Sequence, residues 1–230
     1  MALGTDESFF GFLYSDPKTG KTTDTGYAMP GALWLAEPGA LKSVETVCGY
    51  KPSRHNVRTI IEMTKLVVEL GKMKGKRFTG IVVDDMSQKA EAQLREFEDR
   101  KPDNRYKVFD WMRDALIDLR DAARASGLNI LCNAHLNPPK ETLQGKPMRG
   151  GPRLPGKMQE DLPGAVDVIL MAQSQPSRRA WPFCYRNDPF NQSYVMGDRH
   201  NRVVDYAPMN FAELMRSAGY DIRRLPGAEW

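Results

Sequence analysis

The segment Ser15-Asp16-Pro17-Lys18-Thr19-Gly20-Lys21-Thr22 carries the residue types that bind nucleotide phosphates. It departs from the phosphate-loop pattern G-x-x-x-x-G-K-[ST] only at the first position, where Ser15 replaces glycine. Backbone N–H groups of such a loop surround the phosphates, and Gly20 lets the chain approach them closely. Lys21 would neutralise the β and γ phosphates, and Thr22 would offer its hydroxyl to a magnesium ion. We therefore expect residues 15–22, with Thr23 after them, to bind ATP and Mg²⁺; the alternative is a plain turn from strand to helix.

Acidic residues and a histidine follow three further apolar runs of the chain. Asp84 and Asp85 end the run 78–83, and a phosphate loop needs such an acid to hold magnesium, so Asp84 joins Thr22 as an expected metal-site residue. Asp85 could assist, orient water or cap the next helix. Glu37 follows residues 32–36 and could polarise the attacking water, although an exposed loop acid fits equally well. His135, with Asn133 before it, could contact the γ-phosphate or be structural.

These side chains require strands that end at one edge of a sheet and helices that connect them. Apolar runs predict buried strands at 9–14, 32–36, 78–83, 129–134 and 165–171. Helical spacing predicts helices at 57–68, stopped by Gly71, and at 108–122, capped by Gly127, with a helix from Gly20, a polar helix within 87–107 and a last one near 211–218. Such alternation predicts an α/β fold with a mainly parallel sheet flanked by helices.

The segment after residue 177 has a different pattern, in which aromatic and polar residues alternate. Trp181, Phe183, Tyr185, Tyr194 and Val195 predict antiparallel strands there. Residues 136–158, in contrast, contain many prolines and glycines and predict a long irregular loop. With 230 residues, the chain has enough length for one elaborated domain, which we expect to span 1–230.

Composition excludes several classes of protein. The apolar share of 41% and the charged share of 27% are typical of folded proteins, and no apolar run approaches the roughly 18 residues of a membrane span. The first residues lack the pattern of a secretory signal, so we expect a cytoplasmic protein without a membrane partner. Cys48, Cys132 and Cys184 fit neither a disulfide framework nor a Cys-x-x-Cys metal site. The net charge of +4 is too small to indicate nucleic-acid binding by itself.

The order of these motifs resembles the RecA-like recombinase ATPases, and especially the phage single-strand annealing ATPases, over residues 9–205. Residues 35–41 resemble the RecA strand that carries the catalytic glutamate, and 78–85 resemble a Walker B strand. Residues 133–135 lie where RecA has an amide that senses the γ-phosphate, with His135 in place of glutamine. The resemblance implies a RecA-like core in which Glu37 activates water and His135 senses the γ-phosphate.

The resemblance also implies a nucleic-acid partner and an assembly. The second DNA-binding loop of that family follows the sensor strand, which here is residues 136–158; a solvated surface loop is the alternative. Arg199 lies in a region resembling that from which RecA-like subunits reach a neighbour's nucleotide, and a trans finger and an exposed arginine are equally expected. The basic residues expected to bind single-stranded DNA are Lys140, Lys146, Arg149, Arg153 and Lys157.

Together these features predict an ATPase that acts on single-stranded DNA in recombination, annealing or repair, as a ring or filament. A phage origin, the host cytoplasm and a single-strand binding protein as a further partner are the accompanying expectations. One alternative is a nucleotide-gated DNA-binding or annealing protein with negligible hydrolysis. Another is a different P-loop enzyme, such as a small-molecule kinase or a DNA-packaging motor.

Overall fold

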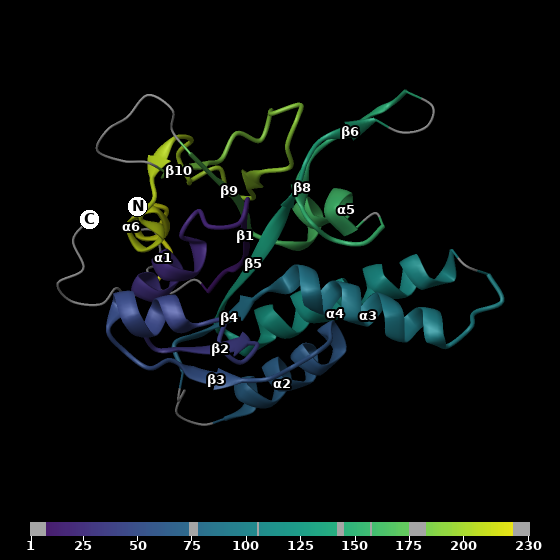
Figure 1. Cartoon of the computed structure of the whole chain (residues 1–230), viewed down its shortest axis with the longest axis horizontal. Helices are drawn as coiled ribbons and strands as arrows, with labels where there is room; N and C mark the ends of the chain where they lie inside the picture. Colours follow the sequence, from purple (N-terminus) through teal and green to yellow (C-terminus); the bar gives the residue numbers. More distant parts are fainter. Residues whose placement is uncertain are drawn as a thin grey trace.

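A mainly parallel sheet forms the centre of the computed structural model, which describes residues 8–73, 78–104, 106–141, 145–156, 158–174 and 183–222 (Figure 1). Successive parallel strands are joined through helices, as right-handed crossovers require. The strand that precedes the phosphate loop lies between two parallel neighbours, so it is an interior strand of the sheet and its carboxyl end is flanked by other strands. The parallel strands in spatial order are β3 (Ser53–His55), β2 (Ala32–Ala36), β4 (Gly80–Asp84), β5 (Asn129–Asn137), β1 (Phe10–Ser15) and β9 (Val168–Ser174).

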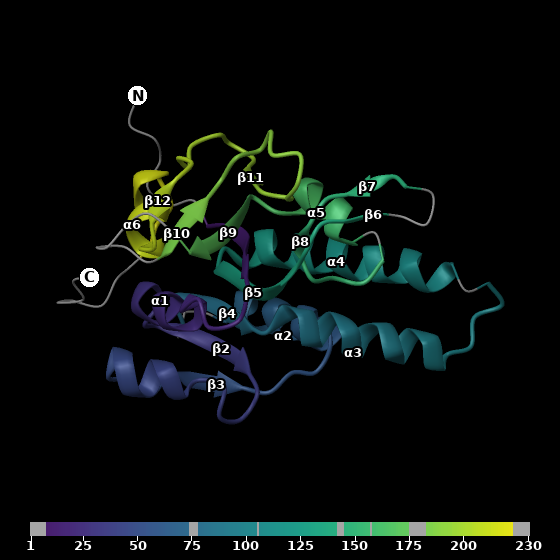
Figure 2. The ribbon, with the colours of Figure 1, turned by 45° about the horizontal axis from the view of Figure 1, so that its top comes forward.

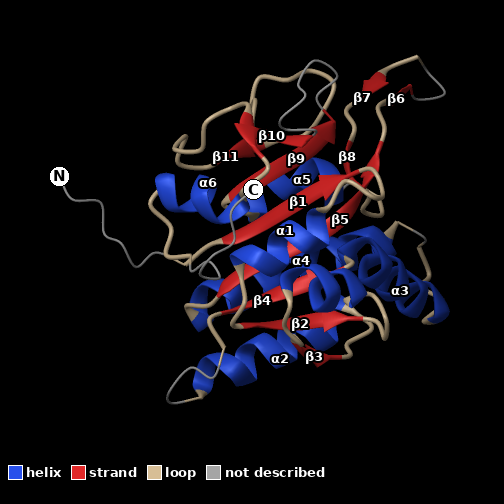
Figure 3. Cartoon of the chain, turned by 60° about the vertical axis from the view of Figure 1, so that its left-hand side comes forward, coloured by secondary structure: helices blue, strands red, loops and turns tan. Residues whose placement is uncertain are grey.

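Helices cover both faces of this sheet, with a separate apolar cluster under each layer (Figure 3). Strand residues alternate between the clusters: Leu33 and Leu35 face one, and Trp34 and Ala36 face the other. One layer consists of α2 (Ile60–Lys72), α3 (Met86–Asp99), α4 (Lys107–Ser126) and α5 (Met158–Ala165), and the opposite layer contains α1 (Lys21–Ala28) and α6 (Phe211–Ser217).

Antiparallel strands extend the sheet beyond β9, as the aromatic pattern predicted. β10 (Phe183–Arg186) pairs with β9 and with β12 (Ala207–Pro208), and β11 (Gly197–Asp198) pairs with the beginning of β9. The prediction is wrong for Tyr194, which makes only an isolated bridge with Gly150, and for Val195, which belongs to no strand. Trp181 lies outside the described residues. The predicted fold class, α/β with a parallel core and C-terminal antiparallel strands, is confirmed.

Residues 136–158 are more regular than the sequence indicated. β5 continues to Asn137, and β8 (Gly151–Pro152) pairs with its end in antiparallel orientation. Between them β6 (Lys140–Glu141) and β7 (Pro147–Met148) form a hairpin that projects beyond the sheet (Figure 2). Strands of two residues are too short to show an alternating pattern, which is why periodicity predicted only a loop.

Two helix boundaries also differ from the prediction. Gly71 lies within α2, because a close approach between helices needs it: a Cβ there would lie 2.9 Å from the Cα of Ser126 on α4. Ala165 ends α5, and the strand expected from that residue begins at Val168. Pro163 inside α5 conceals that helix in the sequence. The short π-helix Val44–Cys48 and the edge strand β3 were not predicted.

None of the helices in the described part of the chain is long and apolar enough to cross a membrane.

Candidate active site

The phosphate loop lies between β1 and α1, at the carboxyl edge of the sheet. Ser15 is the last residue of β1 and is fully buried, and its φ is not positive. The left-handed backbone falls instead on Lys18, with φ 66°, and on Gly20, with φ 86°, which precedes α1. A serine at the first position therefore imposes no backbone strain, since an L-residue is comfortable in a strand.

Lys21 is held in the loop by oxygens of the protein. Its Nζ donates to the Ser15 hydroxyl at 2.6 Å and lies 3.3 Å and 3.4 Å from the carbonyl oxygens of Asp16 and Ser15. Ser15 Oγ lies also 2.5 Å from the Thr19 hydroxyl. Burial lowers the pKa of Lys21, while the charges of Asp84, Asp85 and Asp16 act in the opposite direction. A buried ammonium in a ring of oxygens is an arrangement that phosphate oxygens can replace.

Thr22 and Asp84 face each other across the same site. The Thr22 hydroxyl donates to Asp84 Oδ2 at 2.9 Å, which brings a helix start and the end of β4 together. Burial raises the pKa of the Asp84 carboxyl, the Thr22 bond lowers it, and the nearby charge of Asp85 raises it. The described residues contain no group of three or more His, Cys, Asp and Glu placed to hold a metal. The hydroxyl and carboxylate oxygens are hard ligands that suit a Mg²⁺ whose remaining ligands are phosphate and water.

Asp85 has a structural role as well as a place in the site. Its Oδ1 accepts from Gln88 N at 3.1 Å and so caps α3, the capping role that the sequence left open. Its Oδ2 lies 2.8 Å from His135 Nε2 as an ion-pair contact, but this oxygen makes no aligned hydrogen bond. The peptide bond between Asp84 and Asp85 is cis. The contact places the imidazole of His135 beside the two acids.

Two polar residues of β5 near the site have different surroundings: His135 lines the hollow, and Asn133 is buried in the interior. Ser15 pairs with His135 in the strand register, so His135 lies at the level of the phosphate loop. Its backbone N donates to Ser87 Oγ at 3.1 Å. Asn133 is fully buried instead, with its Oδ1 3.5 Å from the Thr25 hydroxyl of α1. His135 is therefore the residue of this pair that reaches the pocket.

Buried polar contacts fix the direction of α1. Asp24 accepts hydrogen bonds from the Tyr185 hydroxyl and, at 3.0 Å, from the backbone N of Phe211. Burial raises the pKa of Tyr185 above its ordinary value, and the negative charge of Asp24 raises it further. Asp24 thus joins the helix after the phosphate loop to β10 and α6, a link between segments far apart in sequence that the sequence does not reveal.

A hollow of about 340 Å³ unites most of the predicted residues. Neither Glu37 nor Arg199 is among its walls. The predicted residues that line it are Pro17, Lys18, Thr19, Gly20, Lys21, Thr22, Thr23, Asp84, Asp85 and His135, and Ser43 and Ala134 complete the lining.

Glu37 is an exposed residue just outside this hollow. Ala36 pairs with Asp84, so Glu37 follows at the level of Asp85. Its carboxylate forms no hydrogen bond or ion pair within the described part of the chain. Lys89 of α3 stands in a charged run of the sequence but is only 2% exposed. Burial lowers the pKa of Lys89, and the charge of Glu37 acts against that effect.

Arg199 lies at the opposite edge of the sheet from the phosphate loop. β11 pairs with the beginning of β9, and the Arg199 guanidinium donates to the Gly164 carbonyl at 3.0 Å and lies 3.6 Å from Asp167. Within one chain it cannot reach the nucleotide hollow. Its role as a trans finger stays a prediction about an assembly.

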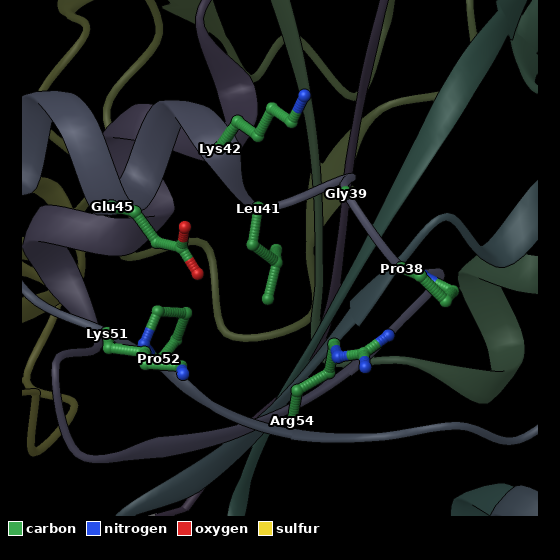
Figure 4. Close-up of a pocket in the computed structure, with 8 residues that line it drawn as sticks. All are labelled: Pro38, Gly39, Leu41, Lys42, Glu45, Lys51, Pro52 and Arg54. Carbon is green, nitrogen blue, oxygen red and sulfur yellow. The ribbon is translucent and has the colours of Figure 1, made fainter.

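A second hollow, of about 420 Å³, is lined mainly by residues that follow β2 (Figure 4). Leu41 lies at its middle, and Lys42, Lys51 and Arg54 supply three positive charges against the single acid Glu45. Lys42 lines this hollow, whereas its neighbour Ser43 lines the nucleotide hollow. The segment after β2 therefore separates a basic hollow from the phosphate site.

Comparison with known proteins adds a family to this geometry. The sequence profile of the AAA domain family matches residues 10–207, whereas no curated protein sequence matches the chain. Among solved structures, the RadB recombinase is 15% identical with a TM-score of 0.48, over 83% of this chain and 86% of that one. The KaiC-like protein PH0186 from hyperthermophilic archaea, Pyrococcus horikoshii OT3, is 14% identical with a TM-score of 0.47, over 89% and 88%. Likeness at this level says nothing of activity, so the profile match and the geometry of the site carry the assignment.

Proposed function

The chain belongs to the AAA domain family, and on that premise we propose that it binds ATP with magnesium and hydrolyses it. The predicted RecA-like P-loop ATPase type is confirmed by this membership and by the strand order around the phosphate loop. The observation that carries the proposal is the buried Lys21 ammonium, which shares one hollow with the Thr22–Asp84 pair. A cation, a hydroxyl and a carboxylate in this arrangement match what a magnesium–triphosphate requires.

Each residue of the hollow has a distinct task in this proposal. Backbone N–H groups of residues 18–20 and the start of α1 bind the phosphates, and Lys21 exchanges the Ser15 hydroxyl for phosphate oxygens. Thr22 and Asp84 would hold the magnesium ion. Bound magnesium supplies charge neutralisation at the β and γ phosphates. His135, which pairs with Ser15 in the strand register and lines the hollow, would contact the γ-phosphate.

Glu37 is the proposed acceptor of the proton from the attacking water. It follows β2 at the same edge of the sheet as Asp84, and its carboxylate has no bonded partner among the described residues. A carboxylate placed beside the γ-phosphate can orient water and take its proton. Because Glu37 lies outside the walls of the hollow, hydrolysis requires it to approach the γ-phosphate.

We propose single-stranded DNA as the partner, bound at the carboxyl edge of the sheet. Lys140 and Lys146 are exposed on the projecting hairpin. Arg149 bonds to the Tyr194 carbonyl and Arg153 pairs with Glu91 at 2.8 Å, so these two position the base of the hairpin while remaining exposed. Lys157 lies outside the described residues.

An exposed aromatic ring lies in the loop bonded to that base. Phe190 is 90% exposed, and Gly150 N donates to Ser193 O at 2.7 Å in the same loop. Exposed aromatic rings beside cations are the usual means of holding unpaired bases. The basic hollow formed by Lys42, Lys51 and Arg54 offers a further contact for phosphates.

Steady-state ATP hydrolysis of the wild type and Glu37→Gln, with and without single-stranded DNA, tests this function. The proposal predicts turnover that DNA stimulates and that Glu37→Gln nearly abolishes, while nucleotide affinity is retained. The exposed position of Glu37 favours the second candidate, a nucleotide-gated DNA-binding protein with negligible hydrolysis. DNA binding that depends on ATP without turnover would establish that candidate. Nucleotide turnover without salt-sensitive DNA binding would indicate a kinase, and binding confined to duplex DNA would indicate a packaging motor.

The assembly and biological setting remain proposals of the same kind. A ring or filament would bring Arg199 of one subunit to the nucleotide of the next. The phage origin, the single-strand binding partner and the cytoplasmic location are predictions from sequence.

A further inference from the structure

Lys89 is a buried cation for which the phosphate-binding roles above give no task. It lies on α3, one helical turn after Asp85, and is only 2% exposed. No hydrogen bond or ion pair joins its ammonium to any residue in the described part of the chain. Removing an ammonium from water costs several kcal/mol unless charges of opposite sign compensate it. The charges around Lys89 therefore decide why a lysine can occupy this position.

Three acids surround this ammonium electrostatically. Burial lowers the pKa of Lys89, and Glu37, Asp85 and Asp84 act against that effect, with Glu37 first among them. The thiol of Cys132 on β5 is also near: burial raises its pKa, and the charge of Lys89 acts in the opposite direction. Lys89 thus lies near the ends of β2 and β4, the two strands that present these acids, and near Cys132 within β5.

Of the three acids, Glu37 alone is free to respond to Lys89. Asp84 accepts from the Thr22 hydroxyl, and Asp85 caps α3 and contacts His135. The Glu37 carboxylate has no bonded partner among the described residues. Strand alternation agrees: Leu33 and Leu35 face the helix layer that contains α3, and Glu37 continues that series.

We propose that Lys89 is a positioning residue for Glu37: its buried ammonium attracts the exposed carboxylate toward the carboxyl ends of β4 and β5, beside the nucleotide hollow. This inference rests on the proposed ATP hydrolysis and assigns a task to a residue that does not itself touch the nucleotide. The attraction of the buried Lys89 ammonium limits the directions that the exposed Glu37 carboxylate can take. Fewer directions raise the fraction of time that Glu37 spends within reach of the attacking water.

Variants at both positions test this task through catalysis. Lys89→Met removes the charge and keeps an unbranched apolar chain, and Lys89→Arg keeps the charge. We expect Lys89→Met to lower kcat about tenfold or more with KM changed less than about twofold, and Lys89→Arg to recover part of the loss. In the Glu37→Gln background, Lys89→Met should have almost no further effect, because Lys89 acts through Glu37.

Gln93→Met is the matched control for a structural effect. Gln93 is a fully buried polar residue one turn further along α3, and its Oε1 accepts from Ile61 N at 3.0 Å. This variant should lower the urea midpoint without lowering kcat of the folded protein. If Lys89→Met behaves in the same way, Lys89 is structural and the inference is overturned. A rise in KM with kcat retained would also overturn it, in favour of direct phosphate contact by Lys89.

Unfolding in urea decides the inference independently of hydrolysis. Glu37→Gln should lower the urea midpoint of the nucleotide-free wild type, since it leaves the buried ammonium with one fewer counter-charge, and should not lower it in Lys89→Met. Equal changes in both backgrounds would overturn the pairing. If the wild type shows no ATP turnover, the proposed hydrolysis fails, while this cycle still decides whether Lys89 and Glu37 interact.

Discussion

Replacing Ser15 by alanine should weaken the nucleotide-free fold and strengthen ATP binding. The 2.6 Å bond from Lys21 to the Ser15 hydroxyl is its shortest contact, and the remaining contacts, at 3.3 Å and 3.4 Å, are long. A hydrogen bond to a charged group contributes about 1.5–3 kcal/mol. If phosphate oxygens replace this bond when ATP binds, the wild type must break the bond in order to bind ATP. Ser15→Ala has no such bond to break, so its ATP affinity should be higher by roughly tenfold to a hundredfold. We expect about tenfold, because water takes part of the place of the hydroxyl.

Fluorescence or calorimetric titration with ATP and Mg²⁺ measures this change, and urea unfolding measures the stability. Ser43→Ala is the matched control, since Ser43 lines the same hollow and its hydroxyl caps no backbone group. The control should leave both quantities nearly unchanged. Weaker or unchanged ATP affinity in Ser15→Ala would refute the idea that Lys21 exchanges Ser15 for phosphate.

Three further predictions address the fold, the charge in the site and the DNA surface. Asp84→Asn should raise the stability of the nucleotide-free protein at pH 7. Because the pKa of Asp84 is raised in the folded state, that state binds more protons than the unfolded state above pH 3.8, and the stability falls as the pH rises from there through the folded pKa. Urea midpoints measured across pH should show this slope only in the wild type. Gly71→Ala should lower the unfolding free energy by about 1–3 kcal/mol, because its Cβ would meet the Ser126 Cα at 2.9 Å; urea unfolding with an unchanged midpoint would contradict the packing. Phe190→Ala should abolish a preference for oligothymidine over an abasic strand in anisotropy titrations, whereas Tyr106→Ala, a 77% exposed aromatic on another element, should retain it.

The phosphate loop and the sheet were predictable because their signals are local. The loop is one contiguous pattern, and the strands that carry Asp84 and His135 contain short apolar runs just before these residues. Strands of one parallel sheet end at one edge, so the acids and His135 had to lie near the loop once the sheet was assumed. The order of the motifs in the sequence therefore predicted most of the residues that line the nucleotide hollow.

Features that depend on packing between distant segments could not be predicted in this way. Lys89 stands in a charged run that is typical of a solvated helix, and its burial depends on how α3 packs against the rest of the fold. Gly71 reads as a helix stop because nothing local reveals that Ser126 lies against it. The contact between Ser15 and Lys21 requires the closed loop, so the sequence showed Ser15 only as a departure from a pattern.

The magnesium dependence of ATP affinity tests the central claim most directly. Equilibrium titration of the wild type and Thr22→Val, each with Mg²⁺ and with a chelator, compares the gain in affinity that magnesium provides. The Thr22 hydroxyl bonded to Asp84 is the proposed magnesium-site oxygen, so the gain should be large in the wild type and mostly lost in the variant, which keeps the shape of the side chain. Absence of ATP binding by the wild type, or an equal gain in both proteins, would contradict the account.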